Sequence, residues 1–596
     1  IAPNTMSRMH FIENGTSGSQ NIIISQGTGA NVTIPAGDVK AVYLDGAGSG
    51  AAVTDAFASL NVVDLKVEDD LTVTDDVSIG GDAAVTGALT GGTVNGVGIS
   101  YNITNFSNSL LISNDAGTGT LDAASNNTGL GHEVFDDLTS GDNNVGVGMQ
   151  ALTKLTTGSK NIAVGAASLD ANTTGSNNVA VGNEAMTTNT TGDDNTAIGT
   201  GALALATTAS NNTAVGKDSL VANTTGDRNV AVGALALDAN TTADANVAVG
   251  YNALTANTTG EINVAVGFQA LDANTTGTRN TGVGASALGS NTTASDNTAF
   301  GSSALTLNTT GAENTAVGSA CLDANTTGTD NTAIGFASLG NNTTGADNTA
   351  VGNLALNENT TGADNTAVGK SALEKNTTAS NNTAFGSSAL GVNTTASFNT
   401  AVGSTALDAN TTGAQNTAVG FDALGANTTG ANNTAVGLNA LENNTTADRN
   451  VAVGMDALAL NTTGSNNVAV GSTCLDANTT GTQNVGVGRD ALSANTTAGN
   501  QTAVGYVPLQ ANTTGSDNTG VGASTLRYNT TGASNTAVGV RAGEDIDNGD
   551  RNTCIGVIAG ANATSADDLT AVGYGAGGTG TLTGHDNTCM GVQALT

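Results

Sequence analysis

The sequence has 596 residues, of which 81 are Gly, 3 are Pro, none is Trp and 38% are hydrophobic, so it is not a typical disordered chain. Its 15 basic and 50 acidic residues give a net charge of −35, which disfavours binding to nucleic acid because phosphate recognition needs Lys and Arg. No apolar run is long enough to cross a bilayer, so we expect no membrane insertion.

Residues 1–60 consist of short apolar runs between Gly-rich turns, as in IENGTSGSQNIIISQGTGANVTIP and VKAVYLDGAGSG. This pattern predicts a small β-rich N-terminal domain over residues 1–60, in which residues 51–60 are long enough for a short helix. Residues 1–20 lack the basic and apolar regions of a signal peptide.

Residues 61–126 form a second region with a different pattern. Within residues 62–91, the run LTVTDDVSIGGDAAVTG alternates apolar and polar residues between turns, which predicts a narrow β-fibre. A transition region follows, and the run SLLIS at 109–113 predicts a strand within it.

A 17-residue repeat occupies residues 127–596. Numbered from its first Asn, the unit reads N-[TV]-[AG]-[VI]-G-x-x-A-L-x-x-N-T-T-[GA]-x-x. The Gly at position 5 recurs from Gly131 to Gly573 in 26 steps of 17, without insertion or deletion. A last copy follows at Gly591, one residue late. Such a strict period predicts identical structural steps, because one inserted residue would turn side chains to the wrong face.

Each copy of the repeat predicts one coil of a parallel β-solenoid. The spacing excludes helix, coiled coil and collagen, since apolar residues do not recur every 3.6 or 3.5 residues and Gly is not every third residue. We expect a strand at V-A-V, a tight bend at Gly, a second short strand at A-L and an N-T-T-G turn. The fold class is therefore all-β, a parallel β-solenoid (β-roll) shaft on the order of 120 Å long at about 4.8 Å per coil.

Stacked coils would place Asn above Asn and Thr above Thr, and Asn ladders hydrogen-bond along such stacks. The N-T-T triplet also matches a glycosylation sequon, although the period already requires a turn there. One coil would bury one Val, one Leu and two or three small residues, too little to offset the entropy lost when a whole coil is ordered. Because V-A-V is apolar on both faces, we expect three parallel chains, a homotrimer, with a dimer left open.

The last copies of the repeat depart from the consensus, since position 9 becomes Gly at Gly543, Gly560 and Gly577. Terminal repeats of solenoids commonly change in this way because they end the stack. We therefore expect a narrower core there, and a further C-terminal domain after it.

No residue pattern predicts catalysis, a cofactor or a metal. The four cysteines replace small residues of the repeat and lack C-x-x-C spacing, which indicates core positions; they are Cys321, Cys474, Cys554 and Cys589. The three histidines form no metal motif; they are His10, His132 and His585. Acidic residues such as Asp330 and Asp347 vary from copy to copy, which argues against a calcium ladder. We expect no catalytic, cofactor-binding or metal-binding residues and no enzyme activity.

The N-T-A-V-G-x-x-A-L-x-x-N-T-T-G unit resembles repeats of predicted phage tail fibres, especially of marine phages, which often carry a C-terminal intramolecular chaperone domain. The opening segments ENGTSGSQ, GTGANVTIP and VYLDGAGSGAAVTDAF look like N-terminal regions of such fibres. The unit is also similar to the N-S-V-A-I-G repeat of trimeric autotransporter adhesin heads, which form left-handed parallel β-rolls.

The resemblance implies a structural tail-fibre shaft, located in the virion and extracellular. It would bind other virion tail proteins and project a tip that attaches to a host cell-surface receptor. The alternative is a bacterial surface trimeric adhesin. A minor alternative is an ice-binding β-solenoid that uses Thr columns. The mixture of Thr and Val at position 2, as in Thr196 and Val230, counts against a regular array.

Overall fold

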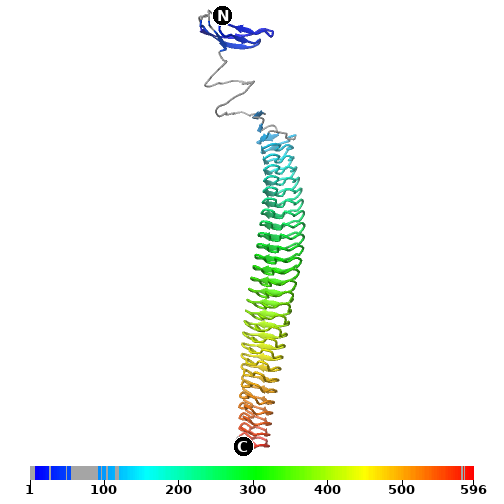
Figure 1. The fold of residues 1–596 in the computed structure, drawn as a ribbon, viewed down its shortest axis with the longest axis vertical. Coiled ribbons are helices and arrows are strands. Elements are labelled where there is room, and N and C mark those ends of the chain that lie inside the picture. The colour runs from blue at the N-terminus through cyan, green and yellow to red at the C-terminus, as the bar shows by residue number, and fades with distance from the viewer. Residues whose placement is uncertain are drawn as a thin grey trace. The chain divides into compact units, whose positions relative to one another are not determined.

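The computed structural model of the protein describes residues 7–25, 28–47, 50, 52–55, 92–94, 97–101, 105–113, 120–578, 582 and 584–595. The chain forms two compact units, residues 1–86 and 87–596 (Figure 1). The described residues contain β-strands and turns and no α-helix, which confirms the all-β class. The β-fibre expected over residues 62–91 lies outside the described residues.

The N-terminal unit is a small antiparallel β-structure. Its sheet has the order β1 (Ser7–Glu13), β4 (Val39–Asp45), β5 (Val53–Asp55), and β2 (Ile22–Ile24) pairs with β3 (Val32–Ile34). Six buried aliphatic side chains form its core: Ile24, Val32, Ile34, Val42, Leu44 and Val53. The helix allowed over residues 51–60 is wrong at 53–55, because these residues pair with β4 as strand β5. The other residues of that stretch, apart from Ala52, lie outside the described residues.

An antiparallel segment precedes the solenoid. The strand predicted at 109–113 is confirmed as β9 (Leu110–Ser113). On one side β9 pairs antiparallel with β7 (Val97–Tyr101), which in turn pairs antiparallel with β6 (Gly92–Val94). On the other side β9 pairs in parallel with the first strand of the repeats. Nearby, β8 (Phe106–Ser107) pairs in parallel with β10 (Ala124–Ser125).

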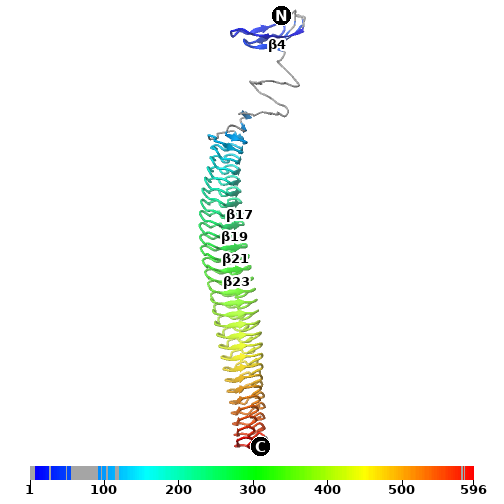
Figure 2. The same ribbon diagram turned by 180° about the vertical axis from the view of Figure 1, so that it is seen from behind.

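The repeats form a parallel stack with one strand per coil (Figures 1 and 2). Its strands are β11 (Thr128–Leu130), β12 (Val145–Val147), β13 (Ile162–Val164), β14 (Val179–Val181), β15 (Thr196–Ile198), β16 (Thr213–Val215), β17 (Val230–Val232), β18 (Val247–Val249), β19 (Val264–Val266), β20 (Thr281–Val283), β21 (Thr298–Phe300), β22 (Thr315–Val317), β23 (Thr332–Ile334), β24 (Thr349–Val351), β25 (Thr366–Val368), β26 (Thr383–Phe385), β27 (Thr400–Val402), β28 (Thr417–Val419), β29 (Thr434–Val436), β30 (Val451–Val453), β31 (Val468–Val470), β32 (Val485–Val487), β33 (Thr502–Val504), β34 (Thr519–Val521), β35 (Thr536–Val538), β36 (Thr553–Ile555), β37 (Thr570–Val572) and β38 (Thr588–Met590).

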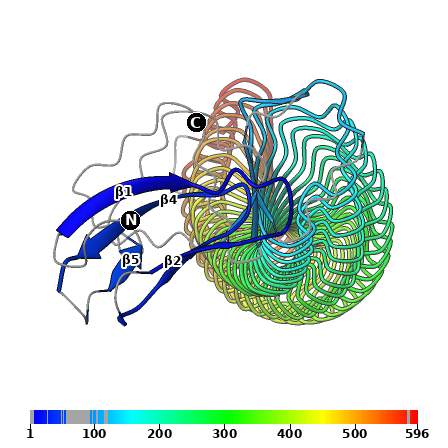
Figure 3. The same cartoon turned by 90° about the horizontal axis from the view of Figure 1, so that it is seen from above.

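Neighbouring strands pair exactly one repeat apart, as in Thr349↔Thr366, and only the last pair, β37 with β38, includes one additional residue, as in Thr570↔Thr588. These pairs confirm the parallel β-solenoid with one coil per repeat. Figure 3, viewed from above, shows the coils lying over one another while their position drifts gradually round the stack.

The coil of residues 348–364 illustrates the backbone path. After strand β24 the chain bends at Gly352, whose φ is 142°. Left-handed conformations follow at positions 7, 9 and 17, with φ of 58° at Leu354, 53° at Leu356 and 57° at Asp364. The second strand expected at A-L is therefore wrong, because alternating positive φ values replace an extended backbone with turns.

The solenoid core contains small residues and one large side chain per coil. In the coil of residues 348–364, Ala350, Ala355 and Leu356 are fully buried. Side chains alternate along a strand, so burial of Ala350 at position 3 turns Thr349 and Val351 outward. The expectation of one Val per coil in the interior is therefore wrong, since the large strand residue at position 4 faces outward.

Two columns of buried Asn run along the interior. At position 1, Nδ2 of Asn348 donates to Oδ1 of Asn331 at 3.1 Å. At position 12, Nδ2 of Asn359 donates to Oδ1 of Asn342 at 2.8 Å. Both amides also donate to the carbonyl oxygen of Gly362 at 2.9 Å, so one acceptor joins the two columns within each coil. Asn359 is fully buried, which supports the turn interpretation of N-T-T over glycosylation.

The last coils fill their interior with different residues. At Gly543 an added Cβ would lie 3.1 Å from both Cδ1 of Ile546 and Cδ2 of Leu526, so these side chains occupy the space that Leu fills elsewhere. Ile546 stands at position 12 in place of Asn, and Leu569 replaces the Asn of position 1. The core was expected to narrow here, but its large apolar side chain is instead supplied from position 12, by Ile546, in place of position 9.

Candidate interaction surface

The outward face of the parallel sheet is the largest continuous feature of the repeats. Side chains at positions 2 and 4 point to this face because they are two residues apart on the same strand. We call these side chains, from β11 to β38, the outer strip. The hydrogen-bonded register of successive strands aligns them into two columns. The strip therefore follows the solenoid from its first coil to its last described coil.

The outer strip carries no charge, and its position 4 column is apolar. Position 4 is Leu, Val, Ile, Phe or Met in every strand from β11 to β38, and position 2 is Thr, Val or Ile. Exposed fractions at position 4 include 37% at Val164, 41% at Ile198, 48% at Phe300 and 52% at Phe385. No Asp or Glu occurs at either position, although the whole chain has 50 acidic residues. The position 4 column therefore gives the strip a continuous apolar edge.

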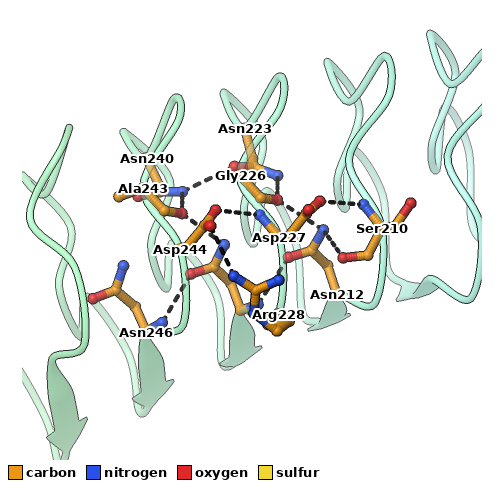
Figure 4. Close-up of polar contacts among 11 residues, drawn as sticks. Ser210, Asn212, Asn223, Gly226, Asp227, Arg228, Asn240, Ala243, Asp244 and Asn246 are labelled. Carbon is orange, nitrogen blue, oxygen red and sulfur yellow. Dashed lines mark hydrogen bonds and ion pairs between the residues drawn. The ribbon is translucent and has the colours of Figure 1, made fainter.

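Acidic side chains lie on the turns instead, where several bind the backbone of the preceding coil (Figure 4). At position 16, Oδ1 of Asp227 accepts from the backbone N–H of Ser210, and Oδ1 of Asp244 accepts from that of Asp227, both at 2.8 Å. Arg228 donates from Nη2 to Oδ2 of Asp244 at 2.9 Å. These carboxylates therefore have a structural role in joining coils.

A second set of carboxylates lies half-buried at position 10. Desolvation by burial raises the pKa of Asp476 to about 6, and the negative charges of Asp490 and Asp456 add to the shift. Burial raises the pKa of Asp238, Asp272, Asp323 and Asp408 in the same way. Among the residues that the structure describes, no group of three or more His, Cys, Asp or Glu side chains is arranged to hold a metal ion.

The four cysteines lie in the interior, as the sequence predicted. Burial raises the pKa of Cys321, Cys474 and Cys554 to about 12, and it also raises the pKa of Cys589. A thiol is reactive as its thiolate, so these side chains are inert at neutral pH.

The histidines lie on different elements. His10 is on β1, His132 is in the first coil, and Nδ1 of His585 lies 3.1 Å from Oδ2 of Asp567 in the last coils. His132 and His585 therefore lie in the first and the last coils of the repeats and do not share a site. Within the described parts of the chain, no helix has the length and apolar character that a membrane crossing requires.

Sequence reasoning identified the two-sided apolar strand but not which face is outward. A signal for it is present in the sequence: position 3 is Ala, Gly or Cys in every copy, whereas position 4 includes Phe300 and Phe385. A position restricted to small residues is typical of an interior with little space, and tolerance of Phe is typical of an open face.

Comparison with known proteins adds no relative. No protein-family model, no curated protein and no solved structure matches this chain.

Proposed function

We propose that this chain is a structural fibre, in which the solenoid is the shaft of a phage tail fibre that holds a host-binding tip away from the virion. The unbroken stack of one coil per repeat is the observation that carries this proposal. The 28 strands from β11 to β38 make 27 steps, which at about 4.8 Å each give a rod of about 130 Å. Each coil contacts its neighbours through the same ladder, which is the construction of a rigid spacer.

The fibre is proposed to be a homotrimer whose chains pack through their outer strips. Three residues of strand span about 10 Å, so the strip covers about 1,300 Å² over the length of the rod. In a trimer each chain divides this area between two partners, about 650 Å² each, which approaches the roughly 800 Å² per partner of a standard interface. A partner that contacts the whole strip must have contact residues spaced at the same interval as the coils, and a second copy of this chain has that spacing. The absence of charge on the strip lets copies approach despite the net charge of −35.

The proposed partners beyond the trimer are other tail proteins of the virion and a receptor on the host cell surface, and the proposed location is extracellular. The N-terminal unit supports an attachment role, because it has a core of its own and exposes Met9 and Tyr43 on its strands. A bacterial surface trimeric adhesin would use the same shaft, but its end would be attached to the bacterial surface and not to a virion.

One observation favours the minor alternative of ice binding. Position 14 is an exposed Thr in every coil from Thr157 to Thr531. Regular columns of Thr are what such a function needs, although position 14 lies in a bend and forms a single column. Thermal hysteresis of the purified protein tests this alternative directly, and a freezing point equal to the melting point removes it.

The test of the fibre uses the full chain. Light scattering should give three times the chain mass of 57.8 kDa, and electron microscopy should show rods of about 130 Å for the repeats. The purified protein should block adsorption of the phage that encodes it to its host. A monomeric mass contradicts the trimer, and a trimer that neither decorates virions nor blocks adsorption contradicts the tail-fibre assignment.

A further inference from the structure

The outer strip carries a second pattern that does not follow the period. Position 2 is aliphatic in three blocks of three consecutive strands, and it is Thr in all the remaining strands from β11 to β38. The blocks are β12–β14, β17–β19 and β30–β32, with central residues Ile162, Val247 and Val468. All nine side chains face outward, so the solenoid core does not account for this choice of residue.

The spacing of the three blocks is unequal. The central strands are β13, β18 and β31, so the blocks are separated by 5 coils and then by 13 coils. Two copies shifted by 5 coils would match one pair of blocks, and shifts of 13 or 18 coils would each match one other pair. Only an unshifted pair of copies matches all three blocks.

We propose that these blocks set the register in which copies of this chain associate, parallel and unshifted, through the outer strip. This inference rests on the proposed function, in which copies contact each other at the strip. The position 4 column, which is mostly Val, separates registers only weakly, because a slip of one coil loses the contact of only one strand in 28. The pattern at position 2 supplies the missing distinction.

The chemistry of position 2 explains how a shifted copy is rejected. In a parallel cyclic assembly without a shift, each side chain lies level with its equivalents in the other copies. Thr then meets Thr, where hydroxyls pair with each other, and the aliphatic blocks meet aliphatic blocks. A shift places Thr hydroxyls against Val and buries them without a partner, which is unfavourable.

The main competitor is the shift of five coils. It aligns the first block of one copy with the second block of another, and it also brings Phe300 of one copy level with Phe385 of another, since these bulky residues of position 4 lie on β21 and β26. In this shift the second block of one copy and the third block of both copies meet Thr, so the third block, Val451, Val468 and Val485, supplies two of the three mismatches.

The test replaces the third block by Thr in a triple variant, V451T/V468T/V485T. Other strands carry Thr at the same outward position, so the coils should fold unchanged. A matched control, T463V/T480V/T497V, changes the exposed position 14 of the same three coils, off the strip.

Register is read by thiol cross-linking. Chains with V351C are co-expressed with chains with V436C, two positions that lie five coils apart on the strip, on β24 and β29. Cross-linked peptides are identified by mass spectrometry, and the native cysteines stay silent because they are buried. In the parent and in the control we expect like links, which join two V351C chains or two V436C chains.

The triple variant should raise the ratio of mixed to like links at least about tenfold, the factor that about 1.4 kcal/mol produces. An unchanged ratio in the triple variant, or mixed links as frequent as like links in the parent, overturns the inference. A trimeric mass without cross-links between residues of the outer strip overturns the register inference but remains compatible with the proposed fibre. A monomeric mass overturns both, so the two proposals fail in distinguishable ways.

Discussion

The coils of residues 161–534 and those of residues 535–578 follow the same backbone path but fill their interiors with different side chains. In the first set, position 9 is Leu or Met in a left-handed conformation, and position 12 is Asn except at Ala206. In the second set, position 9 is Gly at nearly the same φ, 59° at Gly543 and 61° at Gly560, and apolar residues occupy position 12. Both sets of coils therefore share the same backbone path, while the interior residues at positions 9 and 12 differ together between them.

The largest effect is expected where both sets of coils agree, at the Gly of position 5. In Gly352→Ala the new Cβ would lie 2.4 Å from the carbonyl oxygen of Gly369, at a φ of 142° that side chains rarely adopt. We expect a loss of about 4 kcal/mol or more, the upper range for single substitutions, seen as rapid hydrogen exchange in the coils around residue 352.

The matched control is Gly575→Ala at position 7. This Gly has a φ of 64°, which non-Gly residues such as Leu354 adopt in other coils, and its nearest atom to a new Cβ is 3.5 Å away. We expect a cost of about 1 kcal/mol. Equal effects at residues 352 and 575 would contradict the distinction between the two positions.

A second comparison concerns the apolar filling itself. Leu356→Ala removes the large side chain of a consensus coil, and Ile546→Ala removes its counterpart in the last coils. Both should cost about 2–5 kcal/mol, because each leaves a cavity in a packed interior. Local hydrogen exchange is the suitable measurement, since a long stack does not unfold as one unit. A negligible effect at Ile546 would show that the relocated side chain does not support its coil.

The Asn column of position 12 predicts changes of opposite sign. Asn325→Ala leaves Oδ1 of Asn308 without its donor in the interior, which should cost about 1–3 kcal/mol. The chain already contains this defect at Ala206, where Oδ1 of Asn189 has no partner. Ala206→Asn should therefore stabilise the coils around it by about 1 kcal/mol. Local hydrogen exchange around residues 325 and 206 measures both changes, and shifts in the same direction would contradict the ladder.

The smallest expected effect concerns Asp476. Its folded pKa of about 6 lies above its ordinary value of 3.8, so the folded state disfavours the ionised carboxylate. Stability should therefore rise as pH falls from 7 through 6 and level off near 4. The gain should stay below about 1 kcal/mol because the carboxyl is half-exposed and screened by solvent. Asp476→Asn should remove this pH dependence, and local hydrogen exchange around residue 476, compared between the variant and the parent at each pH from 4 to 7, checks it.

The period of the sequence was sufficient to predict one parallel coil per repeat, because Gly352 and its equivalents recur without a gap. It did not reveal the left-handed conformation of Leu356, since Leu carries no signal for positive φ and tertiary packing imposes it. The face of Val351 was ambiguous because both sides of T-A-V accept apolar surroundings. The interior position of Asn359 was missed because Asn is also typical of exposed turns.

The Asn columns give the solenoid a direction. In the position 12 column, Nδ2 of a later Asn donates to Oδ1 of the Asn one coil earlier, as Asn342 does to Asn325 and Asn359 does to Asn342. In the position 1 column the backbone N–H donates in the same direction, as that of Asn348 does to Oδ1 of Asn331. A coil that has just formed therefore presents free acceptors, together with an open strand edge, on the side where the following residues will fold. Synthesis from the N-terminus adds residues on that same side. Each finished coil is thus a template for the next, and the rod can lengthen at the pace of translation.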